Sequence, residues 1–179
     1  MSPPLRAKEH QEAIWQGIKD GTLQVIATDH CSFDFHGDKQ NGKDDFTKCP
    51  NGAPGVETRM PIVFSEGVSK GRLSLNEFAA VTSTNPAKIL VCTQRKVFWR
   101  QGSDADIVLM NPDMEVTITK NILHENVDYT PYEGIQVKGW PVMTMVRGQA
   151  VVENERLQVP LGFGRYINRK PVKYTELLK

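Results

Sequence analysis

An apolar run that stops at an acid, residues 22–31, constrains the fold of this chain more than any other stretch. The run is nearly continuous in hydrophobic and strand-forming residues, namely Leu23, Val25, Ile26 and Ala27. This pattern predicts a strand over residues 22–28 that is buried on both faces, as in an α/β protein. Asp29 would then lie at the carboxyl end of a buried strand, where ligands gather in α/β folds. Position alone supports equally the alternative interpretation, in which Asp29 only caps the strand or the following turn.

The segments on either side of this run are predicted to be a helix and a long loop. A helix over residues 8–19 would stop at Asp20-Gly21 and bury one stripe, made of Ala7, Ile14, Trp15 and Ile18. Residues 32–55 are polar and form a longer stretch than most loops in compact domains. At the end of a buried strand such a loop is expected to be an active-site loop. Its turn-rich part, residues 49–55, would expose backbone groups to a small ligand.

Further helical patterns follow the loop. Residues 56–68 recover helical spacing and would complete a βα unit. The sequence Ser-Leu-Asn-Glu at residues 74–77 is a capping box and predicts the start of another helix. Asn85-Pro86 predicts a new helix over residues 86–91, with the asparagine as its N-cap.

From about Thr93 the patterns become short and strand-like. Strands are predicted at residues 105–110, 116–119, 135–138, 142–147 and 150–152. The last two flank a turn that contains Gly148, so they are expected to form a hairpin. This half of the chain is therefore predicted to be a small antiparallel β module. The tail, residues 160–179, is expected to be an extended arm that docks elsewhere.

The charge balance argues against nucleic acid and membrane partners. The 179 residues include 22 Lys and Arg against 21 Asp and Glu, a formal charge of +1, and the two signs are interspersed. No apolar run approaches the ~20 residues of a membrane helix, and the first residues lack the features of a signal peptide. The 3 cysteines include no Cys-x-x-Cys pair, which fits a reducing compartment. We therefore expect a soluble, cytoplasmic protein.

Several side chains near the end of the apolar run are acceptable zinc ligands. They are Asp29, His30, Cys31, His36 and Cys49. Their spacing matches neither paired Cys-x-x-Cys knuckles nor a His-Glu-x-x-His helix, so a self-contained structural zinc site is the less favoured interpretation. His10 and His124 stand apart and are expected to be surface or satisfied core histidines. Asp104 and Asp106 are expected to cap a turn at the start of a strand.

A set of motifs runs along the whole chain in a fixed order. It comprises Met-Ser-Pro-Pro-Leu-Arg at residues 1–6, Ala-Thr-Asp-His-Cys at 27–31, Gly-Lys-Asp-Asp-Phe-Thr at 42–47, Pro-Asn-Gly at 50–52, Gly-Val-Glu-Thr-Arg at 55–59, Asn-Pro-Ala-Lys at 85–88, Gly-Ser-Asp-Ala-Asp-Ile-Val at 102–108 and Gly-Arg-Tyr-Ile at 164–167. Each motif alone is weak evidence of a relationship to other proteins. Together, with matching gaps, they resemble the carboxyl-terminal portion of dihydropyrimidinases and hydantoinases, which are members of the amidohydrolase superfamily.

The resemblance implies an α/β fold, the carboxyl-terminal part of a (β/α)8 metal-dependent hydrolase barrel joined to part of a small composite β-sandwich. Residues 1–92 would be the last portion of the barrel, and residues 22–28 its eighth strand. Residues 93–159 would belong to the β-sandwich. Residues 160–179 would form an extended arm that reaches a neighbouring subunit in a homotetramer.

The resemblance also implies a zinc-dependent hydrolase that opens dihydropyrimidine or hydantoin rings to N-carbamoyl amino acids. Asp29 would be both a metal ligand and the catalytic proton acceptor, while Ser2 and Asn51 would bind the cyclic amide or imide largely through backbone groups. Two zinc ions would lower the pKa of a shared water and polarise the amide carbonyl. A carboxylate at Asp29 would accept the proton of that water and deliver it to the leaving nitrogen.

Most metal ligands of that family have no counterpart in this sequence. A His-x-His pair, a carboxylated lysine and two further histidines belong to the portion upstream of the one that the motifs match. None of the histidines corresponds to them, whether His10, His30, His36 or His124. A complete barrel needs about 250 residues. We therefore expect a fragment that is inactive alone and does not retain zinc.

Two alternatives remain open at this point. The first is a non-catalytic dihydropyrimidinase-related scaffold protein, which would share the fold but lack the metal ligands. Asp29 and Asn51 favour the enzyme lineage, because a scaffold has no need of a carboxylate at that position. The second is a free-standing α/β domain without a site, which explains the composition but not the ordered motifs.

Overall fold

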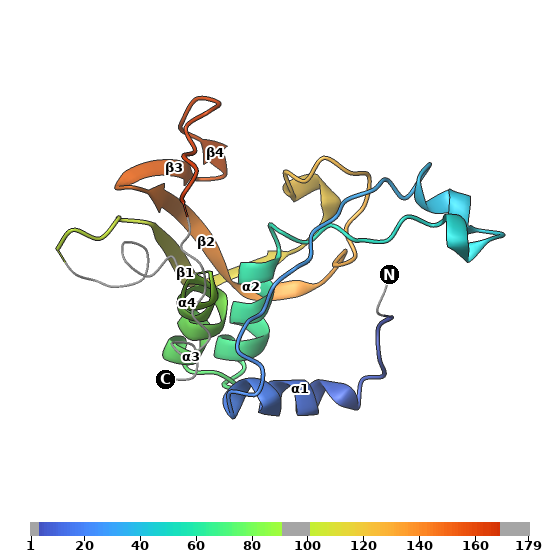
Figure 1. The fold of residues 1–179 in the computed structure, drawn as a ribbon, viewed down its shortest axis with the longest axis horizontal. Coiled ribbons are helices and arrows are strands. Elements are labelled where there is room, and N and C mark those ends of the chain that lie inside the picture. Colours follow the sequence, from blue (N-terminus) through green and yellow to red (C-terminus); the bar gives the residue numbers. More distant parts are fainter. Residues whose placement is uncertain (1–3, 91–100, 169–179) are drawn as a thin grey trace.

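The computed structural model describes residues 4–90 and 101–168, which form a helical half followed by a sheet (Figure 1). The helices are α1 (His10–Lys19), α2 (Arg59–Val63), α3 (Leu75–Ala79) and α4 (Asn85–Ile89). The strands are β1 (Ile107–Thr117), β2 (Gln136–Val146), β3 (Gln149–Glu153) and β4 (Arg156–Leu157). Within the described ranges, the helices are all too short or too polar to cross a lipid bilayer.

Helix α1 confirms the predicted helix and its stop. The Asp20 amide donates to the Gln16 carbonyl at 2.9 Å, and Gly21 follows with φ of 81°, a conformation that suits glycine. Of the predicted buried stripe only Ile18 is buried, in a cluster with Leu73 and Val81. Trp15 is partly buried against this cluster, whereas Ala7 and Ile14 are exposed.

The prediction of a strand over residues 22–28 buried on both faces is wrong for the described structure. The segment is extended, but no strand of the described residues pairs with it, and Leu23 and Val25 are 42% and 37% exposed. A strand is buried on both faces only when layers cover both sides, and here one side alone is covered.

Helices and side chains take the place of strand partners along this segment. The Ile26 amide donates to the Val81 carbonyl at 3.1 Å. The Arg59 guanidinium donates to the Ile26 carbonyl at 2.8 Å, and the Asn85 side-chain amide donates to the Gln24 carbonyl at 2.9 Å. These bonds satisfy backbone groups that a sheet would otherwise satisfy.

The predicted helix over residues 56–68 begins later, with α2 at Arg59, and continues as a π-helical turn over Phe64–Ser69. The capping box of α3 is confirmed. The Glu77 amide donates to the Ser74 hydroxyl at 3.2 Å, and the Glu77 carboxylate accepts from the Ser74 amide at 2.7 Å.

Asn85 does not start a new helix, which corrects the prediction made from Asn85-Pro86. A π-helical turn over Ala80–Thr84 joins α3 to α4, so the chain is helical without a break from Leu75 to Ile89. Asn85 has helical φ and ψ of −68° and −45°, whereas an N-cap residue is non-helical, so Asn85 lies inside the helix. The end of the predicted helix, at Val91, lies outside the described residues.

The four strands form one antiparallel sheet in the order β1-β2-β3-β4, which confirms the predicted β module. Each long strand unites two predicted ones, with irregular pairing between Asn111 and Glu115 of β1. The predicted hairpin is β2-β3. Its turn places Arg147 and Gly148 at φ of 52° and 78°, as tight hairpin turns require, and the Asp106 carboxylate accepts from the Arg147 amide at 2.8 Å.

The helical half and the sheet share a core, where the turn that follows α2 crosses β2 (Figure 1). Phe64 lies directly over Gly139, so close that any side chain at Gly139 would overlap the Phe64 ring. Two serines of the π-helical turn bind the same residue of β2. The Ser65 hydroxyl accepts from the Lys138 amide, and the Ser69 hydroxyl donates to the Lys138 carbonyl, both at 3.0 Å.

Candidate functional site

The loop over residues 32–55 is folded rather than irregular. It contains two 3-10 turns, Lys39–Gly42 and Phe46–Lys48. The second turn is capped by Asp45, whose carboxylate accepts from the Thr47 amide at 3.1 Å. The two turns pack so closely that a side chain at Gly42 would overlap the Cys49 side chain. The sequence indicated a functional loop here, and the structure adds that local hydrogen bonds give it a definite shape.

Asp128, from the connection between β1 and β2, holds the first residues of this loop in place. Its carboxylate accepts from the amides of Phe35 at 2.6 Å and His36 at 2.8 Å. The Asp128 amide in turn donates to the Asp34 carboxylate at 3.2 Å. The pKa of Asp128 is lowered, mainly because the His36 amide stabilises its charged form. No sequence signal indicated this contact, since the partners lie more than ninety residues apart.

The turn around Asn51 packs against the residues that follow Asp29. The Cys31 amide donates to the Ala53 carbonyl at 3.3 Å. Gly52 has φ of 124° and lies so close to the Cys31 carbonyl oxygen that only glycine fits. The structure therefore brings together the two segments that carry Asp29 and Asn51, which the sequence alone could not place relative to one another.

Asp29 and Asn51 are both exposed at this junction. Asp29 adopts φ of 48°, a left-handed conformation that aspartate tolerates better than most residues. Its carboxylate accepts no hydrogen bond from the described residues, so the alternative that Asp29 is a cap gains no support there. Ser2, the third residue that the resemblance assigned to the site, lies outside the described residues.

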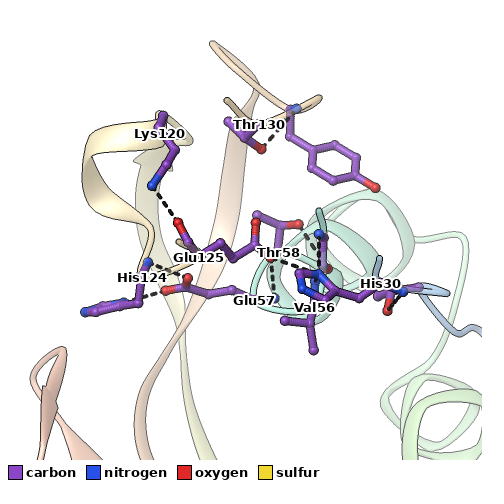
Figure 2. Close-up of polar contacts among 11 residues, drawn as sticks. His30, Val56, Glu57, Thr58, Lys120, His124, Glu125 and Thr130 are labelled. Atoms are coloured by element: carbon purple, nitrogen blue, oxygen red, sulfur yellow. Dashed lines mark hydrogen bonds and ion pairs between the residues drawn. The ribbon is translucent and has the colours of Figure 1, made fainter. Parts of the chain in front are cut away.

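His30 links the segment after the apolar run to the start of the next helix (Figure 2). Its Nδ1 atom accepts from the amides of Gly55 at 3.1 Å and Val56 at 3.3 Å. Because a nitrogen that accepts carries no proton, these bonds favour the neutral tautomer protonated on Nε2. The Glu125 carboxylate lies 3.7 Å from the same Nδ1 atom.

Glu57, Glu125 and His124 complete a polar cluster beside His30 (Figure 2). The Glu125 side chain is only 4% exposed, and its Oε1 atom accepts from the Glu57 amide at 3.2 Å. Its Oε2 atom is buried without a partner among the described residues. The Glu57 carboxylate accepts from the His124 amide and contacts His124 Nδ1, both at 2.7 Å.

His124 is an exposed surface histidine, as expected, but it does not stand apart, because it belongs to this cluster. The hydrogen bond to Glu57 is the main reason that the pKa of His124 is raised. Sequence reasoning did not identify Glu57 or Glu125. Single acidic residues 67 and 68 positions away from their partners carry no local pattern that would reveal them.

The five acceptable zinc ligands do not form a zinc site by themselves. Among the residues described, no group of three or more histidine, cysteine or acidic side chains could hold a metal ion. His30 Nδ1 is engaged by backbone amides, whereas the Asp29 carboxylate and the free Cys31 thiol are exposed. The described residues thus gather fewer than three candidate ligands at Asp29, which does not suffice for a pair of zinc ions.

A family profile and individual relatives both match this chain over most of its length. The sequence profile of the Amidohydrolase family matches residues 2–151. The chain is 45% identical over 177 residues to a D-hydantoinase of Geobacillus stearothermophilus, covering 99% of this chain and 37% of that protein. It is 42% identical over 171 residues to a D-phenylhydantoinase of Escherichia coli, covering 96% of this chain and 37% of the relative.

Solved structures of similar proteins have the same fold over the matched region. A dihydropyrimidinase from Brevibacillus agri NCHU1002 superposes with a TM-score of 0.91 at 48% identity, over 94% of this chain and 36% of that one. A D-hydantoinase from Bacillus sp. AR9 superposes with a TM-score of 0.93 at 45% identity, over 96% and 37% respectively. The chain thus spans a little over a third of the length of the relatives it matches.

Proposed function

The chain belongs to the amidohydrolase family, and from this premise we propose that it supplies part of the active site of a hydantoinase or dihydropyrimidinase. Such an enzyme would open the ring of a hydantoin or dihydropyrimidine to give an N-carbamoyl amino acid. The single observation that carries the proposal is the packing of the Asn51 turn on the residues after Asp29, through Gly52 and Cys31.

In this proposal Asp29 holds and moves a proton. Its carboxylate is exposed and free of hydrogen bonds within the described chain, so it can accept a proton from an attacking water and deliver it to the ring nitrogen that leaves. Asn51, with Ser2, would bind the cyclic amide or imide through backbone groups. Both assignments rest on the matching motifs at residues 1–6, 27–31 and 50–52.

Asp29 would also be one ligand of a zinc site whose other ligands come from outside the described residues. When bound there, zinc would polarise the substrate carbonyl and make hydroxide available at neutral pH. Because the described residues gather no group of three or more candidate ligands, we propose that the 179-residue chain is inactive alone.

The proposal includes the organisation expected from the resemblance. Residues 1–92 would be a portion of a (β/α)8 barrel, residues 93–159 a portion of a β-sandwich, and residues 160–179 an arm that contacts a neighbour in a cytoplasmic homotetramer. A non-catalytic scaffold is not favoured, since the relatives compared above are named as hydantoinases and a dihydropyrimidinase.

A chimera tests the proposed function. Residues 1–179 would replace the matching segment of the Geobacillus stearothermophilus D-hydantoinase, and hydrolysis of hydantoin and dihydrouracil would be measured with zinc present. We expect turnover of at least one substrate. A chimera that elutes and melts like the parent enzyme but hydrolyses neither substrate would refute the proposal.

A further inference from the structure

We infer that Lys39 is a positioning residue that fixes the backbone of Asn51 and thereby sets how tightly the site holds a substrate carbonyl group. Nothing in the sequence motifs singled out Lys39, which precedes the motif at residues 42–47. The structural part of the inference stands on contacts within this chain. Its consequence for substrate rests on the proposed function.

The Lys39 ammonium is shared by the two carbonyl groups that flank Asn51. Its Nζ atom donates to the Pro50 carbonyl at 2.5 Å and to the Gly52 carbonyl at 2.7 Å. The third side of the ammonium faces the Phe33 ring, whose centroid lies 5.3 Å away. An ammonium has three N–H donors, so the carbonyls and the ring engage it from all sides.

Lys39 is itself held firmly by the loop. Its amide donates to the Asp34 carbonyl at 3.1 Å, and the Asp38 carboxylate accepts from the Asp34 amide at 3.2 Å. Asp34 is tied through its carboxylate to Asp128, on the connection between β1 and β2. The backbone that carries Lys39 is therefore held in place by these hydrogen bonds.

Because the peptide bond is planar, this contact also orients the N–H group of Asn51. The Pro50 carbonyl and the Asn51 N–H belong to one planar unit and point in opposite directions. When Lys39 holds the Pro50 oxygen, it also fixes the direction of the Asn51 N–H. The charge on Lys39 polarises that peptide and makes its N–H a stronger donor.

The Asn51 N–H is available for a ligand. Within the described ranges it has no hydrogen-bond acceptor, and Asn51 is exposed beside the segment that carries Asp29. A fixed, polarised N–H recognises an acceptor such as the carbonyl oxygen of a cyclic imide. Loss of Lys39 is therefore expected to weaken substrate binding more than the chemical step.

The first test measures the order of the Asn51 amide in the 179-residue chain by NMR relaxation. In the unaltered chain we expect an order parameter of about 0.85, as for rigid backbone, and in Lys39→Met a value below about 0.6. Lys39→Arg, which keeps the charge and the donors, should restore most of the order. Lys43→Met is the matched control, since it removes an exposed lysine from the same loop and should leave Asn51 unchanged.

An Asn51 amide that is equally ordered in the unaltered chain and in Lys39→Met would overturn the inference. So would a chain in which Lys43→Met disorders Asn51 as much as Lys39→Met does, because the effect would then follow from loop charge. Thermal unfolding of each variant separates local disorder from general loss of the fold.

The second test uses the chimera described above. Lys39→Met should raise KM about tenfold with kcat changed less than about twofold, the pattern of lost uniform binding. Equal losses in kcat and kcat/KM would contradict the positioning role. If the unaltered chimera has no turnover, the proposed function fails, while the order parameter of Asn51 still decides whether Lys39 holds the turn.

Discussion

At the scale of single residues, Gly52 is the tightest point of the candidate site. It combines φ of 124° with direct contact between its backbone and Cys31, and so joins the Asn51 turn to the segment of Asp29. A side chain there meets both backbone strain and overlap with the Cys31 carbonyl oxygen.

Gly52→Ala is therefore expected to lower the free energy of unfolding by at least about 2 kcal/mol. Gly37→Ala is a matched control, because Gly37 has φ of 128° with open space around it and bears the backbone strain alone. Urea unfolding of both variants measures the difference. Equal losses for the two would show that the contact with Cys31 contributes nothing.

The His124–Glu57 pair predicts a pH dependence of stability. The pKa of His124 is raised above its ordinary value of 6.5, chiefly by the hydrogen bond to Glu57. A raised histidine pKa means that the folded state binds the proton more tightly. The stabilisation is thus fully present below pH 6.5 and is lost as pH rises through the folded-state pKa.

This contribution is expected to be below about 1 kcal/mol, because the His124 side chain is 65% exposed and solvent screens the pair. In Glu57→Gln the pKa of His124, followed by NMR titration, should fall toward its ordinary value. Glu155→Gln, which removes a weaker influence on His124, should shift it less. A pKa that does not move in Glu57→Gln would rule out the pair as the cause.

At the scale of elements, a structure could be predicted from sequence where the interacting residues lie close together along the chain. The capping box at Ser74 and the β2-β3 hairpin follow from residues within a few positions of each other, and both are confirmed. The conformation of residues 22–28, by contrast, depends on hydrogen bonds from side chains in α2 and α4, up to 61 positions away along the chain.

The same distinction explains the site. Motifs identified the segments of Asp29 and Asn51, but their contact runs through a glycine with positive φ and a backbone hydrogen bond, which no local pattern specifies. Asn85-Pro86 has the composition of a helix start. The chain before it is already helical over Ala80–Thr84, so Asn85 lies inside a continuous helix rather than at its start.

The capping box provides a prediction for α3. Ser74→Ala should lower the free energy of unfolding by about 1 kcal/mol, because the Glu77 amide loses its acceptor at the helix start. Ser32→Ala, at an exposed loop position, should change it by less than about 0.5 kcal/mol. Chemical denaturation of the two variants makes the comparison, and a Ser74→Ala loss no greater than that of Ser32→Ala would show that the cap does not stabilise the fold.

At the scale of the whole molecule, the sheet supports the site from a distance. Asp128 binds the loop that carries Lys39, and His124 contacts Glu57 just before α2. The two halves are therefore joined on the side of the site as well as at Phe64 and Gly139. Within the described portion, contacts between the two halves therefore hold the Asn51 turn in place.

The metal content of the 179-residue chain is a prediction at this scale. Because the described residues hold no group of three or more ligands, we expect less than one tightly bound zinc per chain after dialysis. Elemental analysis measures the ratio. Two zinc ions per chain, accompanied by hydrolysis of dihydrouracil, would contradict the proposal that this chain supplies only part of the metal site.

The most direct test of the central claim is the turnover of the hydantoinase chimera when Asp29 is changed. Asp29→Asn keeps the shape of the side chain but removes its charge and its capacity to accept a proton, so kcat/KM for hydantoin should fall by about 10²–10⁴-fold. Asp44→Asn, at an exposed position in the loop, should leave kcat/KM unchanged. Near-normal turnover in Asp29→Asn would remove Asp29 from the mechanism and contradict the account.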